Sequence, residues 1–126
     1  MAVIEWTDSA WQLYNDMLEY AKDEFGTKTG RRWEYELLAI YERLHHFPDS
    51  YPPEELLVGK TPLYRRCSMM NRRFKLVYYY DVQEDIVHIV DIWDTRMNPK
   101  TLIRSFHSDV QMYIKISNYK PVKIKN

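Results

Sequence analysis

Positively charged side chains are concentrated in the second half of the chain, in segments with the character of β-strands. The set comprises Arg65, Arg66, Arg72, Arg73, Lys75 and Arg96. Paired strands lie about 4.8 Å apart, so cations on two neighbouring strands can reach a single phosphate group. A guanidinium group binds two phosphate oxygens at once and stabilises the charge that develops during phosphoryl transfer. We therefore predict that these arginines group on one uncovered face of a sheet as an anion-binding site.

A second interpretation of the same residues is purely structural. Arginine and lysine can protect exposed strands from unwanted pairing, while the neighbouring tyrosines fill the core. The run Tyr78-Tyr79-Tyr80 lies among these charges, and at least one of its side chains must face opposite to its neighbours. That side chain could stack on a nucleobase. The residue pattern leaves both interpretations open.

Metal and cofactor chemistry finds no support in the sequence. The four histidines do not occur at a metal-ligand spacing, and a single cysteine, Cys67, makes neither an internal disulfide nor a paired-cysteine zinc site. The chain contains no Walker A loop, GxGxxG, HExxH or GxSxG motif. We expect neither a metal ion nor a cofactor.

Length and charge define the class of protein. The chain has 126 residues, of which 45% are apolar, and its formal net charge is zero. Residues 1–60 contain 12 acidic and 6 basic side chains, whereas residues 61–126 contain 6 acidic and 12 basic ones. The asymmetry favours either a cationic surface or two halves that attract each other. Without a long apolar run or a signal-like start, we expect a soluble, cytoplasmic single domain that does not enter a membrane.

Hydrophobic periodicity predicts the elements that must position the cations. Residues 3–6 are typical of a strand, and Thr7 or Asp8 can cap a helix that stops at Gly26. A second helix is expected from near Thr29 to Pro48, followed by a proline-rich surface loop over residues 48–63. Strands are predicted over residues 64–69, 74–80 and 86–93.

The segment after the last strand is predicted to be helical from Asn98-Pro99 onward. Alternation at residues 110–116 leaves a late strand open, and residues 120–126 form a basic tail. The order β-α-α-β-β-β-α predicts an α+β fold, in which a two-helix hairpin packs on one face of a mostly antiparallel twisted sheet. The other face of the sheet is expected to be open.

Several stretches together resemble the RelE/ParE superfamily of toxins, which includes plasmid stabilisation proteins. They are Val3-Ile4-Glu5-Trp6-Thr7, Leu44-His45-His46-Phe47-Pro48, Tyr64-Arg65-Arg66-Cys67, Phe74-Lys75-Leu76-Val77-Tyr78-Tyr79 and Ile89-Val90-Asp91-Ile92-Trp93-Asp94-Thr95-Arg96-Met97-Asn98-Pro99. The resemblance spans roughly residues 2–100. It implies a toxin domain over residues 1–100, with residues 101–126 forming a C-terminal helix and basic tail of the same domain.

The resemblance implies the toxin of a type II toxin–antitoxin module, neutralised by a cognate antitoxin protein. The RelE branch cleaves mRNA at the ribosome without a metal, and the leading hypothesis is such an endoribonuclease. Arg66 and Arg96 would then be the catalytic residues. Arg65, Arg73, Lys75 and Tyr79 would contact the substrate. The alternatives are a ParE-like binding inhibitor of DNA gyrase, or a degenerate toxin that retains only antitoxin binding.

Two positions depart from the RNA-cleaving branch. Trp93-Asp94 stands where several of its members have histidine or another basic residue, and no tyrosine follows Arg96 closely. Glu54 or Glu55 could serve as a base only if the proline-rich loop folds over the sheet.

Overall fold

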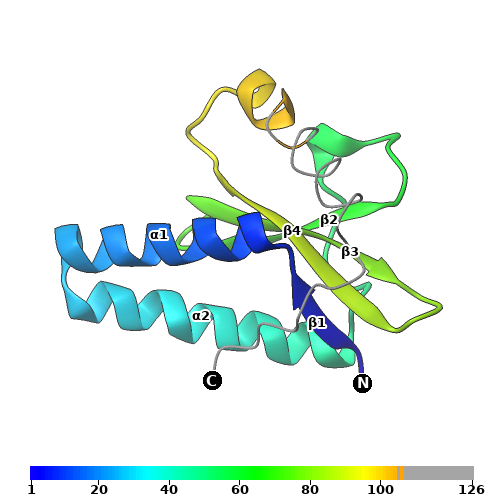
Figure 1. Ribbon diagram of the computed structural model, residues 1–126, viewed down its shortest axis with the longest axis horizontal. Helices are drawn as coiled ribbons and strands as arrows, with labels where there is room; N and C mark the ends of the chain where they lie inside the picture. The colour runs from blue at the N-terminus through cyan, green and yellow to red at the C-terminus, as the bar shows by residue number, and fades with distance from the viewer. Residues whose placement is uncertain (105, 107–126) are drawn as a thin grey trace.

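The structure, a computed structural model, describes residues 1–104 and residue 106 (Figure 1). The elements follow in the order β1 (Val3–Trp6), α1 (Asp8–Phe25), α2 (Thr27–His46), the 3-10 helix η1 (Glu55–Leu57), β2 (Tyr64–Met69), β3 (Phe74–Asp81) and β4 (Ile86–Asp94). Residues 99–104 are helical as well. This confirms the predicted α+β class and element order. The possible strand at residues 110–116 and the basic tail lie outside the described residues.

The two long helices form a hairpin because residues next to their ends determine where each helix begins and stops. The Thr7 hydroxyl accepts a hydrogen bond from the backbone N–H of Ala10 at 3.1 Å and so caps α1. Gly26 then takes a left-handed φ of 92°, which ends α1 and lets α2 begin at the next residue. The second helix therefore starts two residues before the predicted Thr29.

The sheet has the strand order β1-β4-β3-β2. β1 runs parallel to β4, whereas the β4–β3 and β3–β2 pairs are antiparallel. A bulge falls between Val77 and Tyr78: Val77 pairs with Asp91 and Tyr78 with Ile89, so Val90 has no paired residue. The extra residue shifts the alternation of side chains along β4 by one position.

One face of the sheet packs against the helical hairpin, as predicted. This core includes Leu76, Tyr78 and Ile89 from the sheet and Tyr14 and Leu37 from the helices, all of them buried.

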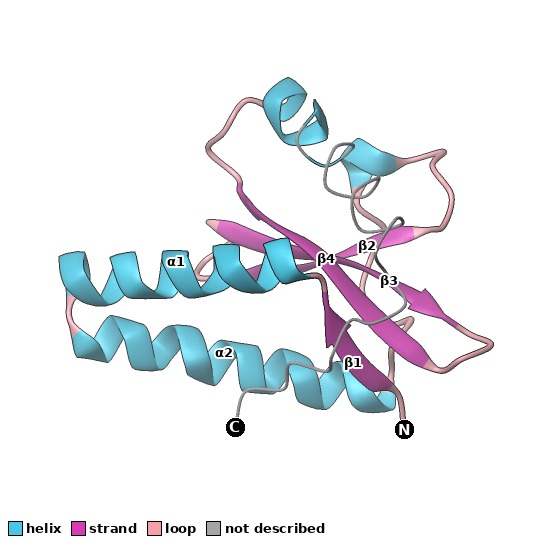
Figure 2. Ribbon diagram, viewed as in Figure 1, coloured by secondary structure: helices cyan, strands magenta, loops and turns pink. Residues whose placement is uncertain are grey.

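The opposite face is not open, and that prediction was wrong. A second buried cluster lies on it, made of Leu57, Tyr64, Val77, Val90, Trp93, Leu102 and Phe106. In Figure 2, η1 and the helix at residues 99–104 lie across the sheet from α1 and α2. The physical reason is the apolar character of Val77, Val90 and Trp93, whose exposure to water would be costly.

Among residues 1–104 and 106, no helix has both the length and the apolar character needed to cross a membrane.

Candidate functional site

Arg65 and Arg66 lie on opposite faces of β2, because successive side chains of a strand alternate. Arg65 shares the helix-facing side with Cys67, and its Nη1 donates to the carbonyl oxygen of Tyr51 at 2.6 Å. Arg66 lies on the other side, opposite Val77 of β3. Arg66, expected to be catalytic, and Arg65, expected to contact the same substrate, therefore do not meet in one site.

The segment before β2 runs along the edge of that strand and then crosses onto the second face of the sheet. The backbone N–H of Arg66 donates to the Pro52 carbonyl at 3.1 Å, and that of Glu54 donates to the Tyr64 carbonyl at 2.9 Å. Prolines suit this position because they have no N–H group to leave unpaired. The loop thus does fold over the sheet, which was the condition set for a role of Glu54 or Glu55.

Glu54 is the carboxylate that this crossing buries, with 1% of its surface exposed. Its Oε1 lies 2.5 Å from Nζ of Lys75 on β3, and its Oε2 accepts from the Leu56 N–H at 2.7 Å. The Lys75 ammonium also lies 5.5 Å from the ring centroid of Trp93. Lys75 is therefore held by a buried ion pair and an aromatic ring.

Arg66 is held in a similar way by the same segment. Its Nη1 donates to the Pro53 carbonyl, and its Nη2 lies 3.5 Å from Oε1 of Glu55. A depression of about 520 Å³ adjoins these groups. It is lined by Tyr51, Pro52, Arg66, Ser68, Arg72, Lys75 and Thr95. We call it the cationic pocket, since three of its lining residues are cations and none is acidic.

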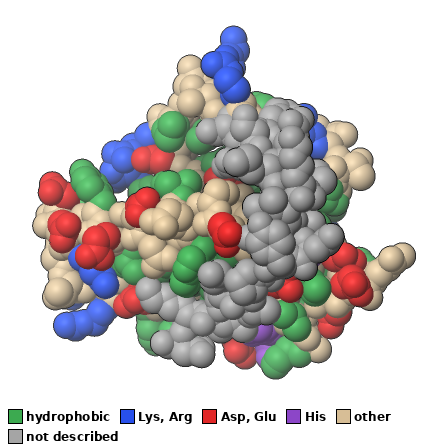
Figure 3. Space-filling view, viewed as in Figure 1, with side chains coloured by type: hydrophobic (Ala, Val, Ile, Leu, Met, Phe, Trp, Pro, Cys, Tyr) green, Lys and Arg blue, Asp and Glu red, His purple; other side chains and the backbone are tan. Residues whose placement is uncertain are grey.

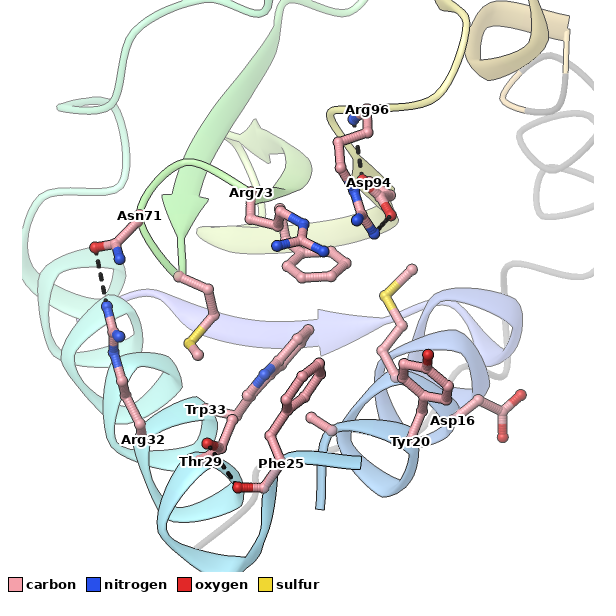
Figure 4. A pocket seen from close by; sticks show the side chains of 14 residues that line it. Asp16, Tyr20, Phe25, Thr29, Arg32, Trp33, Asn71, Arg73, Asp94 and Arg96 are labelled. Atoms are coloured by element: carbon pink, nitrogen blue, oxygen red, sulfur yellow. Dashed lines mark hydrogen bonds and ion pairs between the residues drawn. The ribbon is translucent and has the colours of Figure 1, made fainter. Parts of the chain in front are cut away.

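Arg96 lies in a different hollow, together with Arg73 (Figure 4). Its Nε and Nη2 donate to the two carboxylate oxygens of Asp94, at 3.1 and 2.8 Å. These hydrogen bonds hold the pKa of Asp94 below its ordinary value. Arg96 is thus paired within its own turn and does not meet Arg66 in one pocket.

The hollow around Arg96 is a groove of about 670 Å³ between the end of the helical hairpin where α1 turns into α2 and the ends of the strands. Seven of its fourteen lining residues are apolar or aromatic, including Met17, Ala21, Trp33, Met70 and Phe74, and the other seven are polar or charged. Tyr20 and Phe25 also line it and are 63% and 65% exposed. In Figure 4, Trp33 and Phe25 come from the helices while Arg73 and Arg96 come from the strand side. We call this hollow the apolar groove.

Tyr79 lies on the second face of the sheet, as the alternation of the three tyrosines required. Its ring stacks on His88 with a centroid distance of 4.7 Å and packs edge-on against Tyr64 at 5.8 Å. Burial lowers the pKa of His88, although the charge of Asp81 opposes this. The imidazole is therefore neutral at neutral pH and serves as a stacking partner.

The predicted single cluster of cations is thus divided between two places. Arg66 and Lys75 come together in the cationic pocket, and Arg73 and Arg96 come together in the apolar groove. Arg72 belonged to the predicted cluster of cations but was given no catalytic or substrate-contact role, and the burial of Glu54 was not predicted. The signal for Glu54 was weak: an acidic residue in a proline-rich loop, with no indication of which strand it would meet. Within residues 1–104 and 106, no three histidine, cysteine, aspartate or glutamate residues are placed to hold a metal ion.

Comparisons with known proteins agree with this fold. A search of curated proteins found no match. Among solved structures, the chromosomal ParDE toxin–antitoxin system from P. aeruginosa is similar, with a TM-score of 0.57 and 12% sequence identity. The match covers 75% of this chain and 96% of that one, and it shows a shared fold. The family model of the ParE toxin of the type II toxin–antitoxin system parDE matches residues 4–99. The chain therefore belongs to the ParE toxin family of type II toxin–antitoxin systems, whose partner is an antitoxin protein.

Proposed function

We propose that this toxin acts by binding and inhibiting DNA gyrase, and that it does not cleave RNA. The observation that carries the proposal is the separation of Arg66 from Arg96, each of which is already paired with a carboxylate. Metal-independent cleavage needs positioned cations around one phosphate, together with a general acid and base. A divided and neutralised set of cations supports a toxin that binds its target.

The overall charge is in keeping with this proposal. The formal net charge is zero, and on the face seen in Figure 3 acidic side chains are interspersed with basic ones over the helical hairpin. Binding to RNA is dominated by phosphate contacts and rewards a cationic excess. A protein target makes no such demand.

The apolar groove supplies the kind of surface that a protein target requires. Aromatic side chains are enriched at the centres of protein interfaces, and here Tyr20 and Phe25 stand exposed beside an apolar floor. Membership of the ParE family, a branch that inhibits gyrase, supports gyrase as that target. We therefore place the contact with gyrase at the apolar groove.

The test compares two activities of the purified, full-length toxin. We expect inhibition of supercoiling by gyrase, and intact transcripts in a ribosome-dependent cleavage assay. Phe25→Ser should raise the half-inhibitory concentration about tenfold, the effect of losing one central aromatic contact. Tyr35→Ser is the matched control, because Tyr35 is 78% exposed and does not line the groove. Unimpaired supercoiling at toxin concentrations that arrest growth would contradict the proposal.

RNA cleavage remains the second candidate, favoured by the pairing of Arg66 and Lys75 in the cationic pocket. In that case, expression in bacteria would give ribosome-dependent cuts that vanish in Arg66→Ala. An absence of growth arrest would instead indicate a toxin that retains only antitoxin binding.

A further inference from the structure

Two of the three arginines that line the apolar groove are already paired with carboxylates. Arg96 meets Asp94 at 2.8 Å, and Arg32 meets Glu36 at 2.8 Å. Arg73 also lines the groove and is exposed, and no acidic side chain of the described part of the chain forms an ion pair with it. Arg73 is therefore the cation of the groove that an incoming partner can neutralise.

The remaining acidic residue of the groove lies apart from Arg73. Asp16 is on α1, beside Tyr20 in Figure 4, and its Oδ1 accepts from Nε2 of Gln12 at 2.9 Å. Arg73 lies on the strand side, where the second arginine of that side is balanced by its own carboxylate. The strand side of the groove thus carries one uncompensated positive charge.

A strained turn between β2 and β3 fixes the backbone at this arginine. Met70, Asn71 and Arg72 have positive φ values of 52°, 58° and 67°, a conformation that costs energy in most residues other than glycine. The Thr95 hydroxyl donates to the carbonyl oxygens of Arg72 and Arg73, at 2.9 and 3.0 Å. Such strain persists only where the surrounding structure imposes it. The turn therefore presents Arg73 from a defined position.

Helix α2 holds the same turn and also supplies an aromatic wall of the groove. Glu36 accepts from the Met70 N–H at 2.8 Å, and Trp33 lines the groove one turn of the helix earlier. In Figure 4, Trp33 lies across the groove from Arg73. The aromatic surface and the cation are thus held in one arrangement, which reduces the ordering that binding requires.

We propose that Arg73 determines the specificity of the apolar groove by pairing with a carboxylate on an amphipathic segment of gyrase. This inference rests on the function proposed above and names the chemistry of the segment bound. Apolar side chains of that segment cover the exposed Tyr20 and Phe25, while its acidic side chain meets Arg73. A segment without an acidic group would leave the guanidinium desolvated and unpaired, and a basic one would bring like charges together.

The experiment measures the half-inhibitory concentration of the full-length toxin in a gyrase supercoiling assay. Arg73→Gln should raise it about two- to fivefold, the range for one exposed ion pair, and the difference should shrink at high salt. Arg73→Glu should raise it more than about tenfold, because it places two negative charges together. Arg31→Glu is the matched control: Arg31 is exposed on α2 and does not line the groove, so this variant should inhibit as the parent does.

A photo-crosslinker identifies the bound segment of gyrase. With Phe25 replaced by benzoylphenylalanine, the toxin should label a gyrase peptide that contains an aspartate or a glutamate. Reversing that acidic residue to lysine in gyrase should weaken inhibition by the parent toxin and restore inhibition by Arg73→Glu. A merely structural role of Arg73 would not give this rescue.

The outcomes distinguish this proposal from the function on which it rests. A parent toxin that leaves supercoiling unimpaired contradicts the gyrase function and this proposal with it. If the parent inhibits and Arg73→Glu inhibits equally, or if Arg31→Glu is weakened as much, gyrase remains the target and the role of Arg73 is overturned. A labelled peptide without an acidic residue also overturns it. Unchanged inhibition by Arg73→Glu together with a loss of neutralisation by the antitoxin would assign the groove to the antitoxin instead.

Discussion

Replacing Lys75 with methionine removes one partner of the buried ion pair and leaves the carboxylate of Glu54 without a counter-charge. Two unit charges separated by 2.5 Å attract by about 7 kcal/mol at an effective dielectric constant of about 20, and desolvation offsets much of this. Removing one partner of a buried pair typically costs 3–5 kcal/mol. The Lys75 side chain is 17% exposed, so water can approach the vacated site. We therefore expect Lys75→Met to lower the free energy of unfolding by about 3 kcal/mol, at the lower end of that range.

Urea unfolding followed by circular dichroism gives the change directly, and a double-mutant cycle isolates the ion pair. Adding Glu54→Gln to Lys75→Met removes the stranded charge while keeping an oxygen for the Leu56 N–H, so the double variant should be more stable than Lys75→Met alone by at least about 1 kcal/mol. Lys28→Met, on an exposed part of α2, is the matched control and should change stability by less than about 0.5 kcal/mol. The reasoning is refuted if Lys75→Met costs less than about 1 kcal/mol, or if the second substitution destabilises it further.

Three further predictions concern other parts of the fold. Leu57 is 2% exposed in the second core, so Leu57→Ala should lower the free energy of unfolding in urea by about 2–4 kcal/mol. Leu63→Ala, at a 53% exposed position, is the control. An equal loss of stability in the two variants would contradict a covered second face. Cys67 is fully buried, and burial raises the pKa of its thiol. A thiol reagent should therefore label Cys67 only when the protein unfolds. Rapid labelling of the native protein would contradict the burial of Cys67 in this core. Because hydrogen bonds from Arg96 hold the folded pKa of Asp94 below its ordinary value of 3.8, this carboxylate stabilises the fold above that value, and its contribution is lost as the pH falls through the folded pKa. Arg96→Gln should raise that pKa in an NMR titration of the carboxyl group, and an unchanged value would rule out the pairing as its cause.

Much of the fold was predictable because its signals are local. The helical spacing of Ala10, Tyr14 and Leu18 placed α1, and Thr7 and Gly26 marked its ends. The change to a period of two after the prolines placed the three later strands. The parallel pairing of β1 with β4 is a contact between distant segments, and local periodicity does not specify such a partner.

The candidate site was less predictable, for a related reason. Arg65 and Arg66 are adjacent in sequence, and alternation alone requires them to face opposite ways. The pairing of Arg66 with Glu55 and of Lys75 with Glu54 depends on the path of residues 51–57 across the sheet. No periodicity describes that path, because it follows from the packing of Leu57 into the second core.

By itself, the sequence determined the class of fold, the order of its elements, the resemblance to the toxin superfamily and the presence of the cations. Only the tertiary structure decided which cations meet, which carboxylates neutralise them and which face of the sheet is covered. The physical reason is that backbone periodicity sets the direction of a side chain, whereas its partner is chosen by contacts between segments far apart in the chain.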